Sequence, residues 1–297
     1  MIINRLLIYM IIFMCLVVVF ACDEKKESSQ PETTKNTTQN DLKRSQSTRI
    51  VGGEPASDNW PWMVALIEKQ SSVVTPFCGG SLIAPSWVMT AAHCVENESI
   101  NSFEIFIGDT DLKGDKGQRV SVKQIARHPD YNNMTLDSDI AMVELSVSLN
   151  DYPVIPVLSD TQPITHLNGI VMGWGRTGEF SQKSDTLLQI TVPIVSHETC
   201  LSSYGSGEIT DNMVCAGDIH NSKDACYGDS GGPLIVNLNN QWYIAGIVSW
   251  GEGCAREGYY GVYARVSKFN AFIRQCTESN IWSSEMVASG PDQTQKK

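Results

Sequence analysis

The body of the chain alternates short apolar runs with clusters of turn-forming residues. Runs of this length, separated by Gly, Pro, Asn and Asp, are typical of strands in an all-β sandwich or barrel. Only residues 267–280 carry their apolar side chains at helical spacing, which predicts a C-terminal α-helix. The predicted strands lie at 63–67, 103–107, 140–145, 242–250 and 261–266. The apolar face of the predicted helix consists of Phe269, Phe272, Ile273 and Cys276.

The N-terminus has the pattern of a secretory signal. Arg5 precedes an apolar run that extends to Ala21, and this order of charge and apolar core is typical of signal peptides. The run is shorter than a usual membrane span. We therefore predict a signal peptide over residues 1–22. Its end permits two outcomes, which are cleavage after Ala21 or lipidation of Cys22, because the sequence resembles a bacterial lipobox apart from the bulky Phe20.

Polar segments flank the body on both sides. Residues 23–49 contain no aromatic side chain and a single large aliphatic one, Leu42. Such a segment buries too little apolar surface to fold, so we expect a disordered propeptide or linker. Residues 281–297 form a polar tail. One folded domain is therefore expected over residues 50–280.

The charge of the chain excludes one class of partner. The formal net charge is −11 over 297 residues, and 42% of the residues are hydrophobic. An apolar fraction of this size is ordinary for a globular protein. Nucleic-acid binding needs clustered Lys and Arg, so we expect no nucleic-acid partner. An acidic body instead favours basic substrates, mainly through their rate of encounter at low salt.

Five motifs narrow the interpretation further. They are RIVGG (49–53), TAAHC (90–94), DSDIAMVEL (137–145), GDSGGP (228–233) and SWGEGCA (249–255). In combination these motifs resemble the trypsin-like serine proteases. The resemblance covers about residues 50–280 and implies two six-stranded antiparallel β-barrels, at about 50–158 and 159–265, with an active site between them and the helix after them.

The resemblance assigns the chemistry to Ser230, His93 and Asp139. A serine hydroxyl must lose its proton as it attacks a carbonyl carbon, and a neutral imidazole accepts that proton at physiological pH. A buried carboxylate then orients the imidazole and stabilises its positive charge. Asp137 is the competing carboxylate, and Asp139 is preferred because it directly precedes the apolar strand, as in the family.

The resemblance also places the oxyanion hole and the specificity pocket. The amides of Gly228 and Ser230 would bind the developing oxyanion. Asp224 would lie at the base of the pocket and select Lys or Arg. Ala225 stands where some relatives carry serine, so a lysine amine lacks one partner and arginine is preferred. Further substrate-binding positions by the same resemblance are Ser249, Trp250, Gly251 and Gly261.

A zymogen is implied by RIVGG. Cleavage after Arg49 would free the amino group of Ile50, which in the family pairs with the aspartate before the nucleophile, here Asp229. That pair orders the loops of the pocket and of the oxyanion hole. Because Arg49 is itself basic, self-activation is one route.

Nine cysteines are present, and the resemblance pairs six of them. Disulfides imply an oxidising compartment, in agreement with secretion. For Cys22 and Cys276 two arrangements stay open. Either Cys22 is lipidated and Cys276 is a free thiol packed on the helix, or the two form a disulfide that retains the propeptide. The implied pairs are Cys78–Cys94, Cys200–Cys215 and Cys226–Cys254.

No cofactor or metal is expected. Some relatives bind calcium through glutamates in a loop of the first barrel, and residues 108–118 lack that pattern. We expect a monomer that is secreted or lipid-anchored before activation, whose partners are Arg/Lys-containing proteins or peptides and protein inhibitors of proteases. Two rival functions are a catalytically inert binding protein on a protease scaffold and an esterase or acyl transferase with the same triad.

Overall fold

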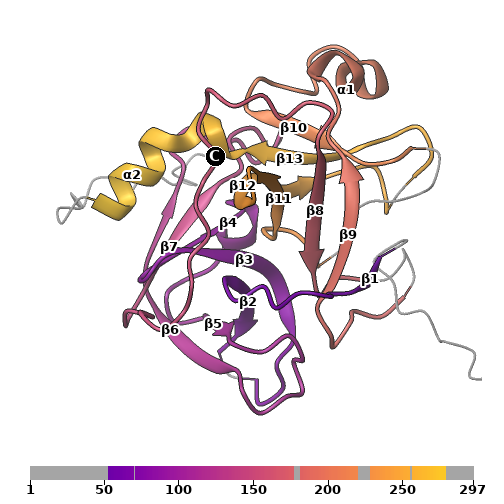
Figure 1. The fold of residues 1–297 in the computed structure, drawn as a ribbon. Coiled ribbons are helices and arrows are strands. Elements are labelled where there is room, and N and C mark those ends of the chain that lie inside the picture. The colour runs from indigo at the N-terminus through magenta and orange to yellow at the C-terminus, as the bar shows by residue number, and fades with distance from the viewer. Residues whose placement is uncertain (1–52, 70, 177–180, 220–227, 255, 279–297) are drawn as a thin grey trace, which may run out of the picture. The chain divides into compact units, whose positions relative to one another are not determined.

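The computed structural model describes residues 53–69, 71–176, 181–219, 228–254 and 256–278. The first half of this body forms a closed antiparallel barrel with strand order β2-β3-β4-β7-β6-β5 (Figure 1). Its strands are β2 (Met63–Glu68), β3 (Pro76–Ala84), β4 (Trp87–Thr90), β5 (Phe103–Ile107), β6 (Gln118–Arg127) and β7 (Ala141–Leu145).

The second half forms a seven-stranded antiparallel sheet with strand order β1-β9-β8-β11-β12-β13-β10. Six of its strands close on themselves, because Ile194 after β9 bridges Ala216 in β10. Val195 N donates to Cys215 O at 3.0 Å beside that bridge. The strands are β1 (Glu54–Pro55), β8 (Asn168–Gly173), β9 (Leu188–Pro193), β10 (Met213–Ala216), β11 (Pro233–Leu238), β12 (Gln241–Trp250) and β13 (Gly261–Arg265).

The fold class predicted from the sequence is confirmed, with one difference in strand assignment. Residues 50–158 were expected to serve the first barrel, yet β1 pairs with β9 of the second sheet, with Glu54 opposite Gln189. Ala56, the first residue after β1, also donates its N–H to Leu187 O at 2.9 Å. Backbone bonding therefore ties the start of the body to the second sheet before the chain enters the first barrel.

Two short α-helices are described, α1 (His197–Tyr204) and α2 (Asn270–Glu278). A 3₁₀ turn, Val266–Phe269, precedes α2, so the regular helix begins three residues later than the apolar spacing predicts. The four residues of the predicted apolar face are all buried, which confirms the helical periodicity. Neither described helix has the length and apolar character that crossing a membrane would require.

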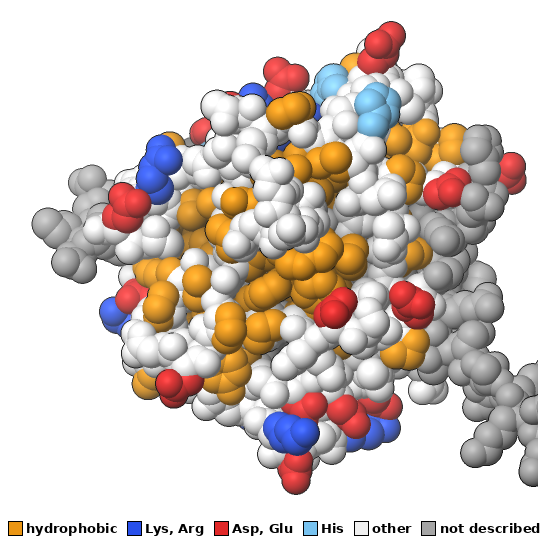
Figure 2. All heavy atoms as spheres, viewed as in Figure 1, with side chains coloured by type: hydrophobic (Ala, Val, Ile, Leu, Met, Phe, Trp, Pro, Cys, Tyr) orange, Lys and Arg blue, Asp and Glu red, His pale blue; other side chains and the backbone are white. Residues whose placement is uncertain are grey.

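Hydrophobic burial is divided between the two halves. The largest of three buried clusters fills the first barrel and continues into α2 and part of the second sheet. A second cluster lies within that sheet, and a third lies around α1 and β10. Figure 2 shows hydrophobic side chains gathered at the centre of one face, with charged side chains mostly towards its edges. Strand β2 is buried over Met63–Ile67, so it reads as a continuous apolar run and not as an alternating one.

Candidate active site

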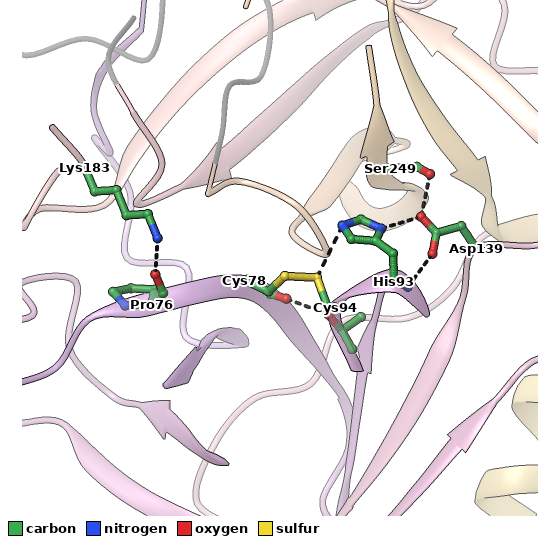
Figure 3. The surroundings of a disulfide bond; sticks show 9 residues. Pro76, Cys78, His93, Cys94, Asp139, Lys183 and Ser249 are labelled. Carbon is green, nitrogen blue, oxygen red and sulfur yellow. Dashed lines mark hydrogen bonds and ion pairs between the residues drawn. A yellow bond between two sulfur atoms is a disulfide. The ribbon is translucent and has the colours of Figure 1, made fainter. Parts of the chain in front are cut away.

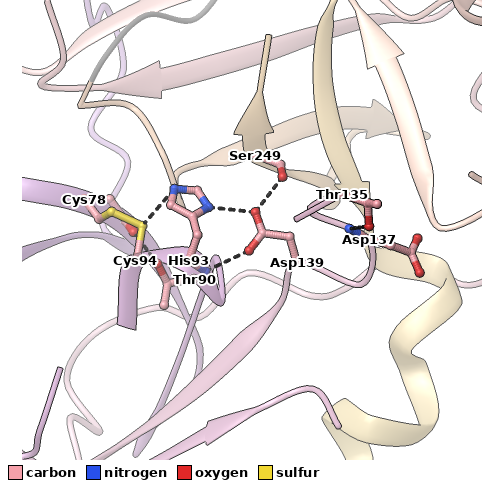
Figure 4. Close-up of polar contacts among 9 residues, drawn as sticks. Cys78, Thr90, His93, Cys94, Thr135, Asp137, Asp139 and Ser249 are labelled. Carbon is pink, nitrogen blue, oxygen red and sulfur yellow. Dashed lines mark hydrogen bonds and ion pairs between the residues drawn. A yellow bond between two sulfur atoms is a disulfide. The ribbon is translucent and has the colours of Figure 1, made fainter. Parts of the chain in front are cut away.

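His93 and Asp139 meet because two neighbouring strands fix the segments that carry them. His93 begins a 3₁₀ turn just after β4, and Asp139 lies two residues before β7. These strands pair with Thr90 opposite Ala141. His93 Nδ1 lies 2.7 Å from Asp139 Oδ2, and the backbone N–H of His93 donates to Asp139 Oδ1 at 2.9 Å (Figure 4). The carboxylate therefore fixes both the ring and the backbone of His93.

Asp139 is completely buried and is also bonded from the second sheet. Ser249, near the end of β12, donates its hydroxyl to Asp139 Oδ2 at 2.5 Å (Figure 3). A buried carboxylate is costly unless hydrogen bonds compensate for lost water, and these three donors supply that compensation. Because Nδ1 faces a carboxylate, the proton of the neutral ring is assigned to Nδ1, which donates to Asp139. The other ring nitrogen, Nε2, is then a proton acceptor.

The segment that contains Ser230 is bonded directly to the first barrel. The carbonyl oxygen of Ser230 accepts from Gly79 N in β3 at 2.8 Å. The next residue, Gly231, is so close that an added Cβ would lie 2.2 Å from Thr90 Oγ1, three positions before His93. The half-buried Ser230 is thus held where the two halves meet, beside the segment of His93.

The competing carboxylate, Asp137, serves a different set of partners. It accepts hydrogen bonds from Thr210 Oγ1, from Ser138 Oγ at 3.2 Å, and from Asn212 Nδ2 at 3.2 and 3.3 Å. Figure 4 shows its carboxylate on the far side of Asp139 from His93. The structure therefore pairs His93 with Asp139 and not with Asp137.

Asp229, the predicted partner of the activation amine, is completely buried. Its Oδ1 accepts from Gly175 N at 2.8 Å. A Cβ added at Gly173 would lie 2.1 Å from the same oxygen, so the carboxylate fits against backbone that carries no side chain. Arg49 and Ile50 lie outside the described residues.

The described part of the predicted pocket comes from two adjacent strands. Ser249 and Trp250 end β12, Gly261 begins β13, and Trp250 pairs with Val262. The Trp250 ring packs edge-on against Tyr204, with ring centroids 4.9 Å apart. Gly251 directly follows β12 and is exposed. The positions predicted for the pocket base and its disulfide, Asp224, Ala225 and Cys226, lie outside the described residues.

Two of the implied disulfides are present, Cys78–Cys94 and Cys200–Cys215. Cys254 is also disulfide-bonded. Cys276 is a buried free thiol, and burial raises its pKa to about 12. This agrees with the arrangement in which it packs on the helix unpaired, while Cys22 lies outside the described residues.

One cluster of potential metal ligands occurs among the described residues, formed by Cys78, His93 and Cys94. A cysteine sulfur binds zinc as a thiolate, whereas both of these sulfurs are committed to a disulfide, which leaves His93 alone as a donor in this cluster. Cys94 Sγ lies 3.7 Å from His93 Nε2, so the disulfide packs beside the base. The donor chemistry of this cluster does not suit a metal.

Sequence reasoning missed one contact of the site. Ser249 was predicted only as a substrate-binding position, yet it donates to Asp139 from 110 positions away. No local pattern could reveal this bond, because it depends on how β12 of the second sheet lies against the loop before β7. The family motif that contains Ser249 was the one available signal.

Comparison with known proteins gives a consistent result. The trypsin family model matches residues 50–273. Trypsin-1 of Astacus astacus is 40% identical over 73% of this chain and 95% of its own length, and trypsin eta of Drosophila melanogaster is 40% identical over 78% and 90%.

Mannan-binding lectin serine protease 1 of Mus musculus is 38% identical over 79% of this chain, but the match covers 36% of its own length. The chain therefore spans about a third of that longer relative. The family match, in contrast, extends over nearly all of the described body. Together with the barrel, the second sheet and the C-terminal helix, these matches show that the chain belongs to the trypsin-like serine endopeptidases of the chymotrypsin fold.

Proposed function

We propose that this chain hydrolyses peptide bonds after arginine or lysine through attack by Ser230. The observation that carries the proposal is the bond between half-buried His93 and buried Asp139, beside a Ser230 segment bonded to β3. His93 Nε2 takes the Ser230 proton as Oγ attacks the carbonyl carbon, and returns it to the leaving amine. In the second half of the reaction, water attacks the acyl-enzyme while His93 Nε2 takes its proton. His93 then returns that proton to Ser230 Oγ as the acid is released.

The oxyanion would be bound by the amides of Gly228 and Ser230. Gly228 has φ +102° and Gly231 has φ +78°, a backbone shape that glycine adopts without strain. An added Cβ would lie 3.0 Å from Gly175 Cα at Gly228 and 2.2 Å from Thr90 Oγ1 at Gly231, so close packing of this turn also favours glycine at both positions. Loss of one such donor typically costs about 3 kcal/mol of transition-state stabilisation.

Selection of the basic side chain is assigned to Asp224, because this residue matches the pocket-base position of the trypsin-like family. Gly251 and Gly261 would leave room for a long side chain, and Ala225 would favour arginine over lysine. The two relatives that this chain nearly spans are both named trypsins. An acidic chain, with a net charge of −11, also favours encounter with basic substrates.

Activation by cleavage after Arg49 is part of the same proposal. The new ammonium of Ile50 would pair with Asp229, whose complete burial favours a cationic partner. An α-amino group has an ordinary pKa of about 8, so activity is expected to decline as the pH rises above that value. Cleaved enzyme that stays fully active at strongly alkaline pH would contradict this pairing.

We further propose that residues 1–22 direct secretion and that residues 23–49 are the propeptide. If Cys22 carries lipid, cleavage after Arg49 frees the catalytic body from the membrane. Fractionation before and after cleavage tests this, because the body should move to the soluble fraction. A body that stays with the membrane would indicate a second attachment, such as a Cys22–Cys276 disulfide.

The decisive experiment uses the secreted chain cut between Arg49 and Ile50. Matched peptide amides ending in arginine or lysine should both be cleaved, with arginine faster, and Ser230→Ala should abolish cleavage. Equal or faster turnover of lysine would overturn the preference. An inert wild-type protein would favour a binding function on the protease scaffold.

A further inference from the structure

In the loop before β7, Asp137 bonds the segment that precedes β10 of the second sheet. This residue follows Leu136 in the first half of the body, whereas Thr210 and Asn212 belong to the segment before β10. Thr210 Oγ1 donates to Asp137 Oδ1, and Asn212 Nδ2 bridges both carboxylate oxygens at 3.2 and 3.3 Å. Hydrogen bonds to a charged acceptor are stronger than neutral ones, so this is a firm link between the halves.

The attachment lies in strained backbone. Leu136 has φ +54° and Ser138 has φ +56°, a conformation that residues with a side chain rarely adopt. Such strain persists only where the surroundings enforce it. Asp137 lies between these two residues. Its backbone bridges Asn132 within the loop, with Asn132 N donating to Asp137 O at 3.1 Å, while its side chain is held from the other half. Asn212 Nδ2 also lies 3.2 Å from Ser138 Oγ, so one amide contacts two successive residues.

The strained segment leads directly to the buried carboxylate of the candidate active site. Asp139 follows Ser138 and is held by His93 on one side and by Ser249 on the other. Ile140 N donates to Ser138 O at 2.8 Å, which continues the tight path into β7. If Leu136 and Ser138 relaxed to ordinary backbone angles, Asp139 would shift relative to His93.

We propose that Asp137 is a positioning residue, whose bonds to Thr210 and Asn212 hold the strained backbone that aims Asp139 at His93. The inference rests on the proposed function for its kinetic consequences. Its structural consequence, the geometry of the His93–Asp139 bond, does not depend on the substrate. Asp137 itself touches neither His93 nor Ser230 by any bond among the described residues.

The test compares Asp137→Ala with Asp211→Ala in chain cut at 49/50. Asp211 lies between the two partners but is 93% exposed, so it controls for loss of an acid in the same segment. A displacement near 1 Å in an active site can cost on the order of 100-fold in rate, so we expect a roughly 10- to 100-fold fall in kcat for Asp137→Ala. KM should change little, and Asp211→Ala should behave as wild type.

Two further measurements separate positioning from general damage. The far-downfield proton resonance of His93 Nδ1 should shift or broaden in Asp137→Ala, whereas binding of benzamidine, which fills only the side-chain pocket, should stay unchanged. Asn212→Ala should reproduce part of the effect, and the double variant should lose less than the product of the two single losses. If Asp137→Ala folds poorly, Asp137→Asn replaces it in the test, because asparagine keeps the side-chain size. Its kcat should lie between those of the wild type and Asp137→Ala.

An unchanged kcat and an unchanged His93 resonance in Asp137→Ala would overturn the inference while leaving the proposed function intact. Equal weakening of benzamidine binding and of kcat would also overturn it, because that outcome indicates a general structural role. A wild-type chain that is inactive after cleavage overturns the proposed function and removes the kinetic part of the inference. In that case, the His93 resonance alone decides whether Asp137 positions Asp139.

Discussion

Replacement of Gly231 by alanine should open the contact between the Ser230 segment and the first barrel. Gly231 has φ +78°, and its N–H donates to Val248 O at 2.9 Å. An added Cβ would lie 2.2 Å from Thr90 Oγ1 and 2.5 Å from Gly79 O. These two atoms already share a hydrogen bond of 2.8 Å, and both are buried, so neither moves without breaking that bond.

The cost has two parts. A left-handed backbone costs an alanine about 1 kcal/mol relative to glycine. Overpacking a well-filled site costs about 1–3 kcal/mol more, which gives a total of about 2–4 kcal/mol. For a domain of this size each kcal/mol corresponds to about 2–4 °C, so Tm should fall by roughly 4–16 °C.

Thermal unfolding measures this in a Ser230→Ala background, which removes self-digestion. Gly258→Ala is the matched control, because Gly258 has φ +88° and no atom within 4 Å of its added Cβ. The control should show only the backbone cost of about 1 kcal/mol. Equal Tm shifts for the two variants would refute the claim that close packing against Thr90 and Gly79 excludes a side chain at Gly231.

Three further predictions concern single side chains. Ser249→Ala removes a donor to the buried Asp139 carboxylate and should destabilise the fold by about 1–3 kcal/mol in denaturant unfolding. Ser267→Ala, which removes an exposed hydrogen bond to Asp160, should cost much less. Burial lowers the pKa of His128 from its ordinary value near 6.5 against the opposing charges of Asp130 and Asp137. As the pH falls, the unfolded chain therefore protonates His128 before the folded chain does. The stability that His128 contributes is complete above pH 6.5 and is lost as the pH falls below it. The Tm advantage of wild type over His128→Gln should therefore shrink between pH 7.5 and 5, and a constant advantage would contradict the burial of that imidazole. Cys276, with its pKa raised to about 12, should resist a thiol reagent at pH 8 in the native protein and react after denaturation; a thiol still absent after denaturation would instead indicate a disulfide to Cys22.

Local pattern predicted the elements that carry their own periodicity. The run 103–107 is a strand with the predicted bounds, and α2 buries all four of its predicted apolar residues. Strand β6 was missed because polar Lys123 and Gln124 interrupt its apolar positions, at the point where its pairing with β7 shifts register. Strand β1 was missed because two exposed residues form a strand only through pairing with β9.

For the candidate site, too, the sequence predicted one part and the structure supplied the other. The motifs around His93, Asp139 and Ser230 named residue types suited to proton transfer and nucleophilic attack, because side-chain chemistry is a property of the sequence itself. The choice between Asp139 and Asp137 rested on resemblance until the structure showed which carboxylate His93 contacts. The two acids are two positions apart, yet the carboxylate of Asp139 lies against His93 and that of Asp137 lies on the far side of Asp139 (Figure 4).

By itself, then, the sequence determined the chemical groups, the strand and helix periods, and the cysteines available for pairing. Only the tertiary structure decided that Ser249 donates to Asp139, that Asn212 anchors Asp137, and that Gly79 holds Ser230. Each of these bonds joins the two halves of the body across a long stretch of sequence. Such contacts depend on how two separately closed sheets pack together, and that packing is set by many buried side chains at once and not by any local run of residues.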